Sequence, residues 1–113
     1  VVMHMRGTPQ TMQADPRYDD VVREVGEFFE ERLRTLAESG IPPAAVCLDP
    51  GIGFGKTLDH NLELLANGSA FTRLGRPVCL GVSRKGVIGV LIGRQRHERL
   101  AGSLAVACFA AAR

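Results

Sequence analysis

Short, continuous apolar stretches recur along the chain and are separated by longer segments in which apolar and polar positions mix. The apolar stretches lie at residues 1–4 (VVMH), 45–49 (AVCLD) and 77–81 (PVCLG). Parallel strands that helices cover on both faces have this continuous apolar character, whereas half-exposed strands alternate. The pattern therefore predicts a short buried strand at each of these places.

The segment between the first two strands has the spacing of an amphipathic helix. Asp15 is the expected N-cap, Pro16 the first helical residue, and Gly40 the C-terminal stop. Apolar residues at steps of three and four predict one buried stripe, made of Val22, Val25, Phe29, Leu33 and Leu36. The many charged residues on the other faces indicate solvated surface.

Two further helices are expected in the second half of the chain. The first spans residues 58–67, with Thr57 as N-cap, Gly68 as its end, and Leu58, Leu62 and Leu65 facing inward. After the third strand come VSRKG and a short apolar turn, VIGVLIG. The last helix carries Leu100, Leu104 and Cys108 at four-residue spacing, and its small residues suit close packing.

The predicted order is strand, helix, strand, helix, strand, helix, which is an α/β fold class with parallel strands. The residues with chemistry follow the strand ends, at 4–6, 49–54 and 83–85. In a (β/α)₈ barrel or an open doubly wound sheet, active sites form at this end of the strands. His4 itself is interpreted as a hydrogen-bonded structural residue.

Composition narrows the class of protein. The chain has 113 residues, 45% of them hydrophobic, and a net charge of +2, so we expect one globular domain without a nucleic-acid partner. The basic cluster at 94–99 is interpreted as a solvated loop. Cys47, Cys79 and Cys108 are far apart, which favours reduced, buried thiols over a disulfide or zinc site. No apolar stretch approaches the roughly 20 residues of a membrane span, so a cytoplasmic location is expected.

The chain opens without methionine and stops inside a helical pattern. We therefore interpret residues 1–113 as a partial domain, a segment of a longer protein. Three strand–helix units would make only part of a closed barrel.

The stretch LDPGIGFGKT, residues 48–57, looks like a phosphate-binding loop but does not meet its requirements. A P-loop needs a glycine five residues before Gly55, and Pro50 stands there, without an N–H to donate. Asp49, at the end of the second strand, could be an N-cap, a metal ligand or a substrate acceptor. One carboxylate is too few for a metal site, whereas its two oxygens match a planar edge with two parallel N–H donors.

The SRK triplet after the third strand supplies a candidate cation. Lys85 lies between Gly81 and Gly86, which let the backbone approach a ligand. The side chain of Ser83 can donate to a carboxylate, and Arg84 suits a carboxylate or a phosphate. A solvated surface lysine is the alternative.

At these residues the sequence resembles the dihydropteroate synthases, the folate-pathway enzymes that sulfonamides target. The likeness is carried by MHMRGTPQTMQ at 3–13, LDPGIGFGKTLDHNLELL at 48–65, LGVSRKGVIG at 80–89 and RLAGSLA at 99–105. The resemblance implies a (β/α)₈ TIM barrel, of which this chain would supply about three consecutive units, similar to strands 5 to 7.

It also implies a reaction: 6-hydroxymethyl-7,8-dihydropterin diphosphate condenses with p-aminobenzoate to give 7,8-dihydropteroate and pyrophosphate. Asp49 would accept hydrogen bonds from the pterin edge and Lys85 would contact the pterin ring, which makes these the expected catalytic residues. Met3, Gly53 and Gly81 would line the pterin pocket. Phe54 would pack on p-aminobenzoate, with Ser83 and Arg84 near its carboxylate.

Several parts of the family site are expected outside this chain: an early Asp and Asn, the Asn that helps to hold Mg²⁺, a late R-x-H motif that grips the diphosphate, and two mobile loops. We therefore expect Mg²⁺ and a homodimer only for the full-length protein, and inactivity for the isolated segment. Ile52 replaces a common aromatic, which predicts an aliphatic pocket wall. A pterin-binding methyltetrahydrofolate corrinoid methyltransferase and a non-catalytic homologue are the alternatives.

Overall fold

The computed structural model describes residues 1–112 as a small parallel sheet flanked by helices. Strand β1 (Val2–Met3) pairs in parallel with β2 (Leu48–Asp49), so that Val2 lies opposite Leu48 and Met3 opposite Asp49. The third expected strand is reduced to a parallel bridge between Leu48 and Val78. It is closed by bonds from Leu48 N to Pro77 O (2.9 Å) and from Cys79 N to Leu48 O (2.7 Å). The predicted α/β class with parallel strands is confirmed.

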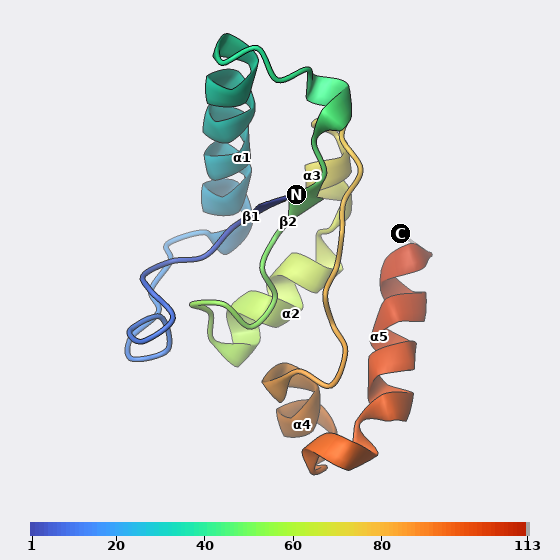
Figure 1. The fold of residues 1–113 in the computed structure, drawn as a ribbon. Coiled ribbons are helices and arrows are strands. Elements are labelled where there is room, and N and C mark those ends of the chain that lie inside the picture. The colour runs from blue at the N-terminus through green and yellow to red at the C-terminus, as the bar shows by residue number, and fades with distance from the viewer. Residues whose placement is uncertain (113) are drawn as a thin grey trace.

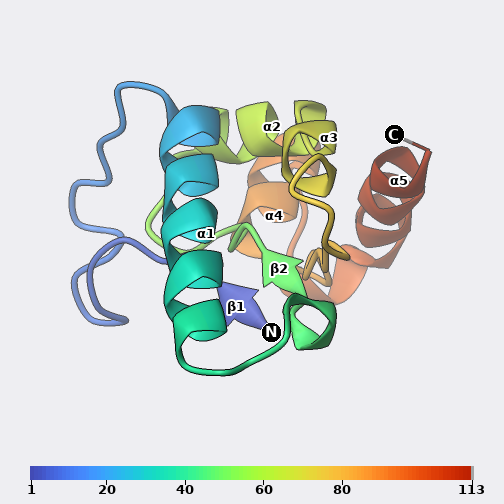
Figure 2. The same ribbon diagram turned by 90° about the horizontal axis from the view of Figure 1, so that it is seen from above.

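Five α-helices and two 3₁₀ turns lie between and after these strands in the described residues. In chain order the helical elements are α1 (Val21–Glu38), η1 (Pro43–Ala45), α2 (Leu58–Ala66), α3 (Ser69–Thr72), α4 (Gly86–Ile92), η2 (Arg96–Glu98) and α5 (Leu100–Ala111). Seen from above, α1, α2, α3 and α5 form an arc along one side of β1 and β2 (Figure 2). Helices α1, α2, α3 and α4 contribute buried apolar side chains to the core, whereas α5 adds only the partly buried Val106. Within the described part of the chain, no helix is long and apolar enough to cross a membrane.

Helix α1 begins later than the sequence predicts. Its N-cap is Asp20, whose carboxylate accepts from Arg23 N (2.9 Å), and not Asp15. The carboxylate of Glu24 in the first turn also accepts from the backbone N–H groups of Asp19 and Asp20 (2.8 and 3.2 Å). Asp15 instead pairs with a neighbouring arginine on the surface. The later cap leaves residues 5–20 free to form a long connection after β1.

The stripe predicted on α1 is largely confirmed. Val25 and Phe29 are fully buried, and the structure adds Val21 to them. The remaining predicted members, Val22, Leu33 and Leu36, are partly buried against the same core. Gly40 ends the helix in a left-handed conformation (φ +80°), as expected of a C-terminal glycine.

For helix α2 the structure confirms the predicted N-cap, but the buried face differs from the predicted one. The hydroxyl of Thr57 accepts from His60 N (3.2 Å). Leu65 is buried as predicted, whereas Leu62 is 38% exposed and Leu64 takes its place in the core. Helix α2 ends at Ala66 with Asn67 as its C-cap, and the predicted stop, Gly68, has a right-handed backbone that leads directly into α3.

The last part of the chain is more helical than predicted. The expected apolar turn at 87–93 forms α4, which ends at a left-handed Gly93 (φ +63°). Helix α5 packs closely on α4 through Gly102, since a side chain there would come within 2.7 Å of Ile88. Leu104 is exposed. The prediction of buried thiols is wrong for Cys79 and Cys108, which are exposed, and Cys47 is only partly buried.

Candidate functional site

The segments that follow β1, β2 and the third strand gather at one end of the molecule, together with α4 (Figure 1). This is the carboxyl end of the parallel strands. All sequence-predicted site residues lie on or beside these segments. Their arrangement at one end follows from the parallel pairing, since parallel strands finish at the same edge.

Asp49 lies at the carboxyl end of β2, opposite Met3, which is its paired residue on β1. One carboxylate oxygen, Oδ1, accepts from Gly51 N at 2.8 Å, and this bond fixes the first turn of the loop after β2. Each carboxylate oxygen can accept two hydrogen bonds, so the group keeps acceptor capacity for a ligand. Asp49 is thus both a turn residue and a half-buried anion at the mouth of the site.

Lys85 approaches the site from the segment that follows the third strand. Its Nζ donates to the carbonyl of Ile52 (2.5 Å) and lies 4.7 Å from the centre of the Phe54 ring. Gly81 and Gly53 lie beside this side chain, because a Cβ on them would be at ordinary contact distance from it, 3.4 Å from its Nζ and 3.6 Å from its Cδ respectively. The structure therefore brings Gly53, Phe54, Gly81 and Lys85 together.

The electrostatics of Lys85 follow from its half-buried position. Loss of solvent lowers the pKa of its ammonium group, and the nearby Asp49 carboxylate opposes this shift. A cation close to an aromatic ring and a carboxylate can bind a planar, polar heterocycle. This is the chemistry that the arrangement offers.

Lys56 has a structural place that sequence reasoning left without a role. Its side chain is only 3% exposed, and its Nζ contacts His4 Nδ1 (3.0 Å), Gly51 O (3.1 Å) and Phe54 O (3.0 Å). These contacts can use all three ammonium protons. Burial lowers the pKa of Lys56 to about 8, against the attraction of Asp49. The G-K-T ending of the loop thus braces the loop from inside.

His4 is a structural residue, as the sequence predicts. Its ring is buried, meets Phe28 edge to face at 5.0 Å, and presents Nδ1 to Lys56. Burial, followed by the charges of Lys56 and Arg6, lowers the pKa of His4 to about 4. A neutral His4 can accept from the Lys56 ammonium, which links the end of β1 to the loop after β2.

Glycines let this loop pass close to other backbone. Gly51 and Gly55 have positive φ values (+69° and +65°), and a Cβ on them would come within 1.9 Å of His4 O and 2.5 Å of Arg6 O. Asn61 of α2, 3% exposed, accepts from Gly53 N through Oδ1 at 2.7 Å. Sequence reasoning missed Asn61, although a polar residue on the inward face of a predicted helix is a usable signal.

The comparisons with known proteins agree with this geometry. The family model described as "Pterin binding enzyme" matches residues 1–113. The chain belongs to the pterin-binding enzyme family. It is 47% identical over 110 residues to the dihydropteroate synthase of Escherichia coli (strain K12). The aligned region covers 97% of this chain and 39% of the E. coli protein.

Solved structures of dihydropteroate synthases are similar throughout the chain. The Yersinia pestis enzyme, solved as a sulfonamide drug complex, has a TM-score of 0.94 at 40% identity over 96% of this chain and 40% of its own. The Thermus thermophilus enzyme, solved in complex with 6HMPPP, has a TM-score of 0.91 at 47% identity. The match covers 97% of this chain and 44% of the Thermus chain. The chain thus spans about two fifths of the length of these relatives.

Ser83 and Arg84 are placed differently from the other predicted site residues. Both are exposed, and they directly precede Lys85 in the chain. The backbone of Arg84 is held, because its N–H donates to Ser103 Oγ on α5 (2.8 Å). Ser103 is a second residue beside the site that sequence reasoning missed.

Two expectations about the pocket are corrected or limited. The side chain of Ile52 is fully buried in the hydrophobic core, so it is a core residue and not an aliphatic pocket wall. Across residues 1–112, no group of three or more His, Cys, Asp or Glu side chains could hold a metal ion. The expectation of Mg²⁺ for the full-length protein stays a prediction.

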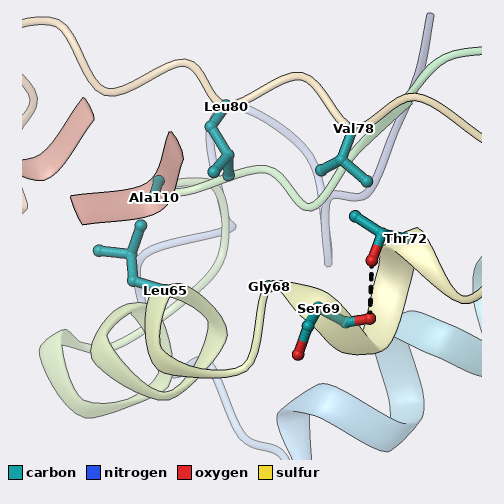
Figure 3. A pocket seen from close by; sticks show the side chains of 7 residues that line it. All are labelled: Leu65, Gly68, Ser69, Thr72, Val78, Leu80 and Ala110. Carbon is teal, nitrogen blue, oxygen red and sulfur yellow. Dashed lines mark hydrogen bonds between the residues drawn. The ribbon is translucent and has the colours of Figure 1, made fainter. Parts of the chain in front are cut away.

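A separate hollow lies between α2, α3, the third strand and the end of α5 (Figure 3). Its walls are mainly apolar, and the hydroxyl of Thr72 is used in a bond to Ser69 O (2.9 Å). It shares no residue with the cluster around Lys85. The hollow is lined by Leu65, Gly68, Ser69, Thr72, Val78, Leu80 and Ala110. It contains no charged side chain and offers no comparable chemistry.

Proposed function

We propose that the full-length protein, meaning the natural protein that carries these residues with any flanking sequence, is a dihydropteroate synthase. It condenses 6-hydroxymethyl-7,8-dihydropterin diphosphate with p-aminobenzoate and releases pyrophosphate. The observation that carries the proposal is the cluster of Asp49, Phe54 and Lys85 at the carboxyl end of parallel strands. It occurs in a chain 47% identical to an enzyme of that name.

In this proposal Asp49 and Lys85 bind the pterin. The Asp49 carboxylate accepts from the amino-pyrimidine edge, and Met3, Gly53 and Gly81 line the pocket. Lys85 exchanges its bond to Ile52 O for a contact with the pterin ring. A charge-assisted bond of this kind is about twice as strong as a neutral one.

The second substrate would lie on the exposed side of the cluster. Phe54 is half-buried and offers a ring face to p-aminobenzoate, while Ser83 and Arg84 are close in sequence to Lys85 and exposed to solvent. A guanidinium and a hydroxyl suit the carboxylate of that substrate. The presence of an aromatic ring next to Lys85 favours the synthase over a corrinoid methyltransferase.

The reaction needs positioning and electrostatics more than a protein nucleophile. The carbon–oxygen bond to the diphosphate breaks, pyrophosphate leaves with the electron pair, and a pterin-methyl cation remains. The arylamine nitrogen then forms the new carbon–nitrogen bond and loses a proton. Residues that hold both substrates in line can supply a large part of the rate.

Some parts of the proposal concern residues beyond this chain. Mg²⁺ would be held by residues outside it, and no step is assigned to the ion here. The identity of the three strands as the fifth to seventh of a TIM barrel, the homodimer and the cytoplasmic location stay predictions.

The decisive experiment is Asp49→Asn in the full-length protein. Asparagine keeps Oδ1, so the bond from Gly51 N is retained, but the charge that faces the pterin is lost. Pterin binding should weaken by about 1.5–3 kcal/mol, measured by titration calorimetry. Asp59→Asn, on the exposed first turn of α2, is the matched control and should bind normally. Unchanged pterin affinity in Asp49→Asn would contradict the assignment.

A second experiment concerns the 113-residue chain alone. We expect no dihydropteroate formation from it in an assay with both substrates and Mg²⁺, because diphosphate-binding residues are expected elsewhere. Clear turnover by the isolated chain would show that these residues are sufficient.

A further inference from the structure

Arg84 has an unusual backbone conformation. Among residues 1–112 it is the one non-glycine residue with a positive φ, at +51°. For an L-residue this left-handed region is sterically unfavourable. Such a residue keeps its conformation only where the surrounding structure holds it in place. Arg84 directly precedes Lys85, so whatever holds it also sets the direction of the Lys85 side chain.

The N–H side of this turn is held by Ser103 of α5. Ser103 is only 7% exposed, and its Oγ accepts from Arg84 N at 2.8 Å. The same hydroxyl donates to Arg99 O at 2.7 Å, which fixes the direction of its proton. The hydroxyl is therefore oriented to accept from the turn.

The carbonyl side of the turn is held by Arg99, directly before α5. Its Nη1 donates to the carbonyls of Arg84 and Lys85, both at 3.3 Å, and its Nε donates to Arg94 O at 3.0 Å. The guanidinium lies against Gly89 of α4, where a Cβ would be 2.3 Å from its Cζ. The rigid, planar guanidinium group can donate to several carbonyls at once, whereas the ammonium group of a lysine is a single point charge.

We propose that Arg99 and Ser103 are positioning residues of the substrate site. Together they hold the Arg84–Lys85 turn so that Lys85 faces Phe54 and Arg84 faces the second substrate. The inference rests on the proposed function, since it takes the substrate roles of Arg84 and Lys85 from there. Neither positioning residue touches a substrate.

The test uses four variants of the full-length protein. Ser103→Ala removes the hydroxyl that accepts from Arg84 N, and Ser103→Thr keeps a hydroxyl. Arg99→Met removes the guanidinium group, and Arg99→Lys keeps only the positive charge. Arg96→Met, on the exposed η2 turn, is the matched control. KM for each substrate, kcat, the melting temperature and the amide hydrogen exchange of Arg84 are measured for all of them.

Ser103→Ala and Arg99→Met should raise KM for the pterin diphosphate or p-aminobenzoate by about tenfold or more. They should also make the Arg84 amide exchange faster. Ser103→Thr should recover most of the loss, and Arg99→Lys only part of it. A purely structural role predicts a lower melting temperature and fewer active molecules with unchanged KM. Arg96→Met should behave as the wild type.

KM values within twofold of the wild type in both Ser103→Ala and Arg99→Met, with unchanged Arg84 exchange, would overturn the proposal. If Arg99→Met does not fold, Gly89→Ala provides the same test, because its Cβ displaces the guanidinium while Arg99 remains. If the wild-type protein makes no dihydropteroate, the proposed function fails. The exchange of the Arg84 amide then still tells whether Ser103 and Arg99 hold the turn.

Discussion

The two loops that build the candidate site are held in place in opposite ways. The loop after β2, residues 50–57, is braced by its own buried Lys56 and by Asn61 just beyond it. The turn at 83–85 is braced from a distance, by Arg99 and Ser103. The first loop is thus part of the core, whereas the second depends on how α5 docks.

The glycines show the same difference. Gly51 faces the backbone carbonyl of His4, which cannot move without shifting β1, whereas Gly89 faces the flexible end of the Arg99 side chain. Changes in the first loop should therefore destabilise the folded protein. Changes around the second should leave it folded and alter substrate binding. The following predictions, made for the full-length protein, test this contrast.

The largest effect is expected for Lys56→Met. Methionine fills the space but donates nothing, so His4 Nδ1 and the carbonyls of Gly51 and Phe54 lose their partner. Because each buried orphaned acceptor costs about 1–3 kcal/mol, the free energy of unfolding should fall by about 3–5 kcal/mol. Chemical denaturation measures this, with exposed Arg73→Met as the control. A loss below about 1 kcal/mol, the size of one ordinary hydrogen bond, would contradict the role of Lys56 as a brace.

The next prediction compares the loss of stability caused by an alanine at Gly51 with the loss caused by an alanine at Gly89. Gly51→Ala combines a positive φ with a Cβ 1.9 Å from His4 O, and should destabilise the protein by about 3 kcal/mol. Gly89→Ala can be relieved by moving Arg99, so its cost should stay below about 1 kcal/mol. Thermal unfolding of both variants compares them directly. Equal losses would remove the proposed distinction between the loops.

Sequence reasoning succeeded where the signal was local. The parallel strands, the Thr57 cap and the Gly40 stop each depend on a few adjacent residues, and the structure confirms them. Asp49 was singled out because an acidic residue follows an apolar stretch directly, but its bond from Gly51 N was not predicted. The assignment of substrate roles came from resemblance to a family, and the described contacts do not test it.

The failures have physical reasons of two kinds. Asp15 and Asp20 are both good caps, and the choice is made by Glu24, which accepts from the backbone at Asp20 and pairs with distant Arg6. Leu62 was favoured because several leucines on a short helix fit more than one stripe. Contacts between distant residues have no local signal, as for Lys56 with His4 across 52 residues.

A pH effect of intermediate size is expected at His4. Burial lowers its pKa from 6.5 to about 4, so between these values the unfolded chain binds the extra proton. The free energy of unfolding should therefore fall as the pH is lowered from 6.5 to 4, by about 2–3 kcal/mol. His4→Asn, which keeps an acceptor but does not titrate, should lose this part of the pH dependence. Exposed His97→Asn should retain it, and acid titrations followed by circular dichroism compare the three proteins.

The smallest effect tests whether the loop after β2 is really braced from within. Tyr18, on the long connection after β1, donates its hydroxyl to Gly55 O at 2.9 Å, while its ring lies under the Arg6 guanidinium at 4.0 Å. Tyr18→Phe removes only the hydroxyl and keeps the ring contact. One partly buried hydrogen bond is worth about 1 kcal/mol, so the loss measured by denaturation should be several times smaller than for Lys56→Met. A loss as large as that of Lys56→Met would mean that the connection after β1, and not the buried lysine, fixes the loop.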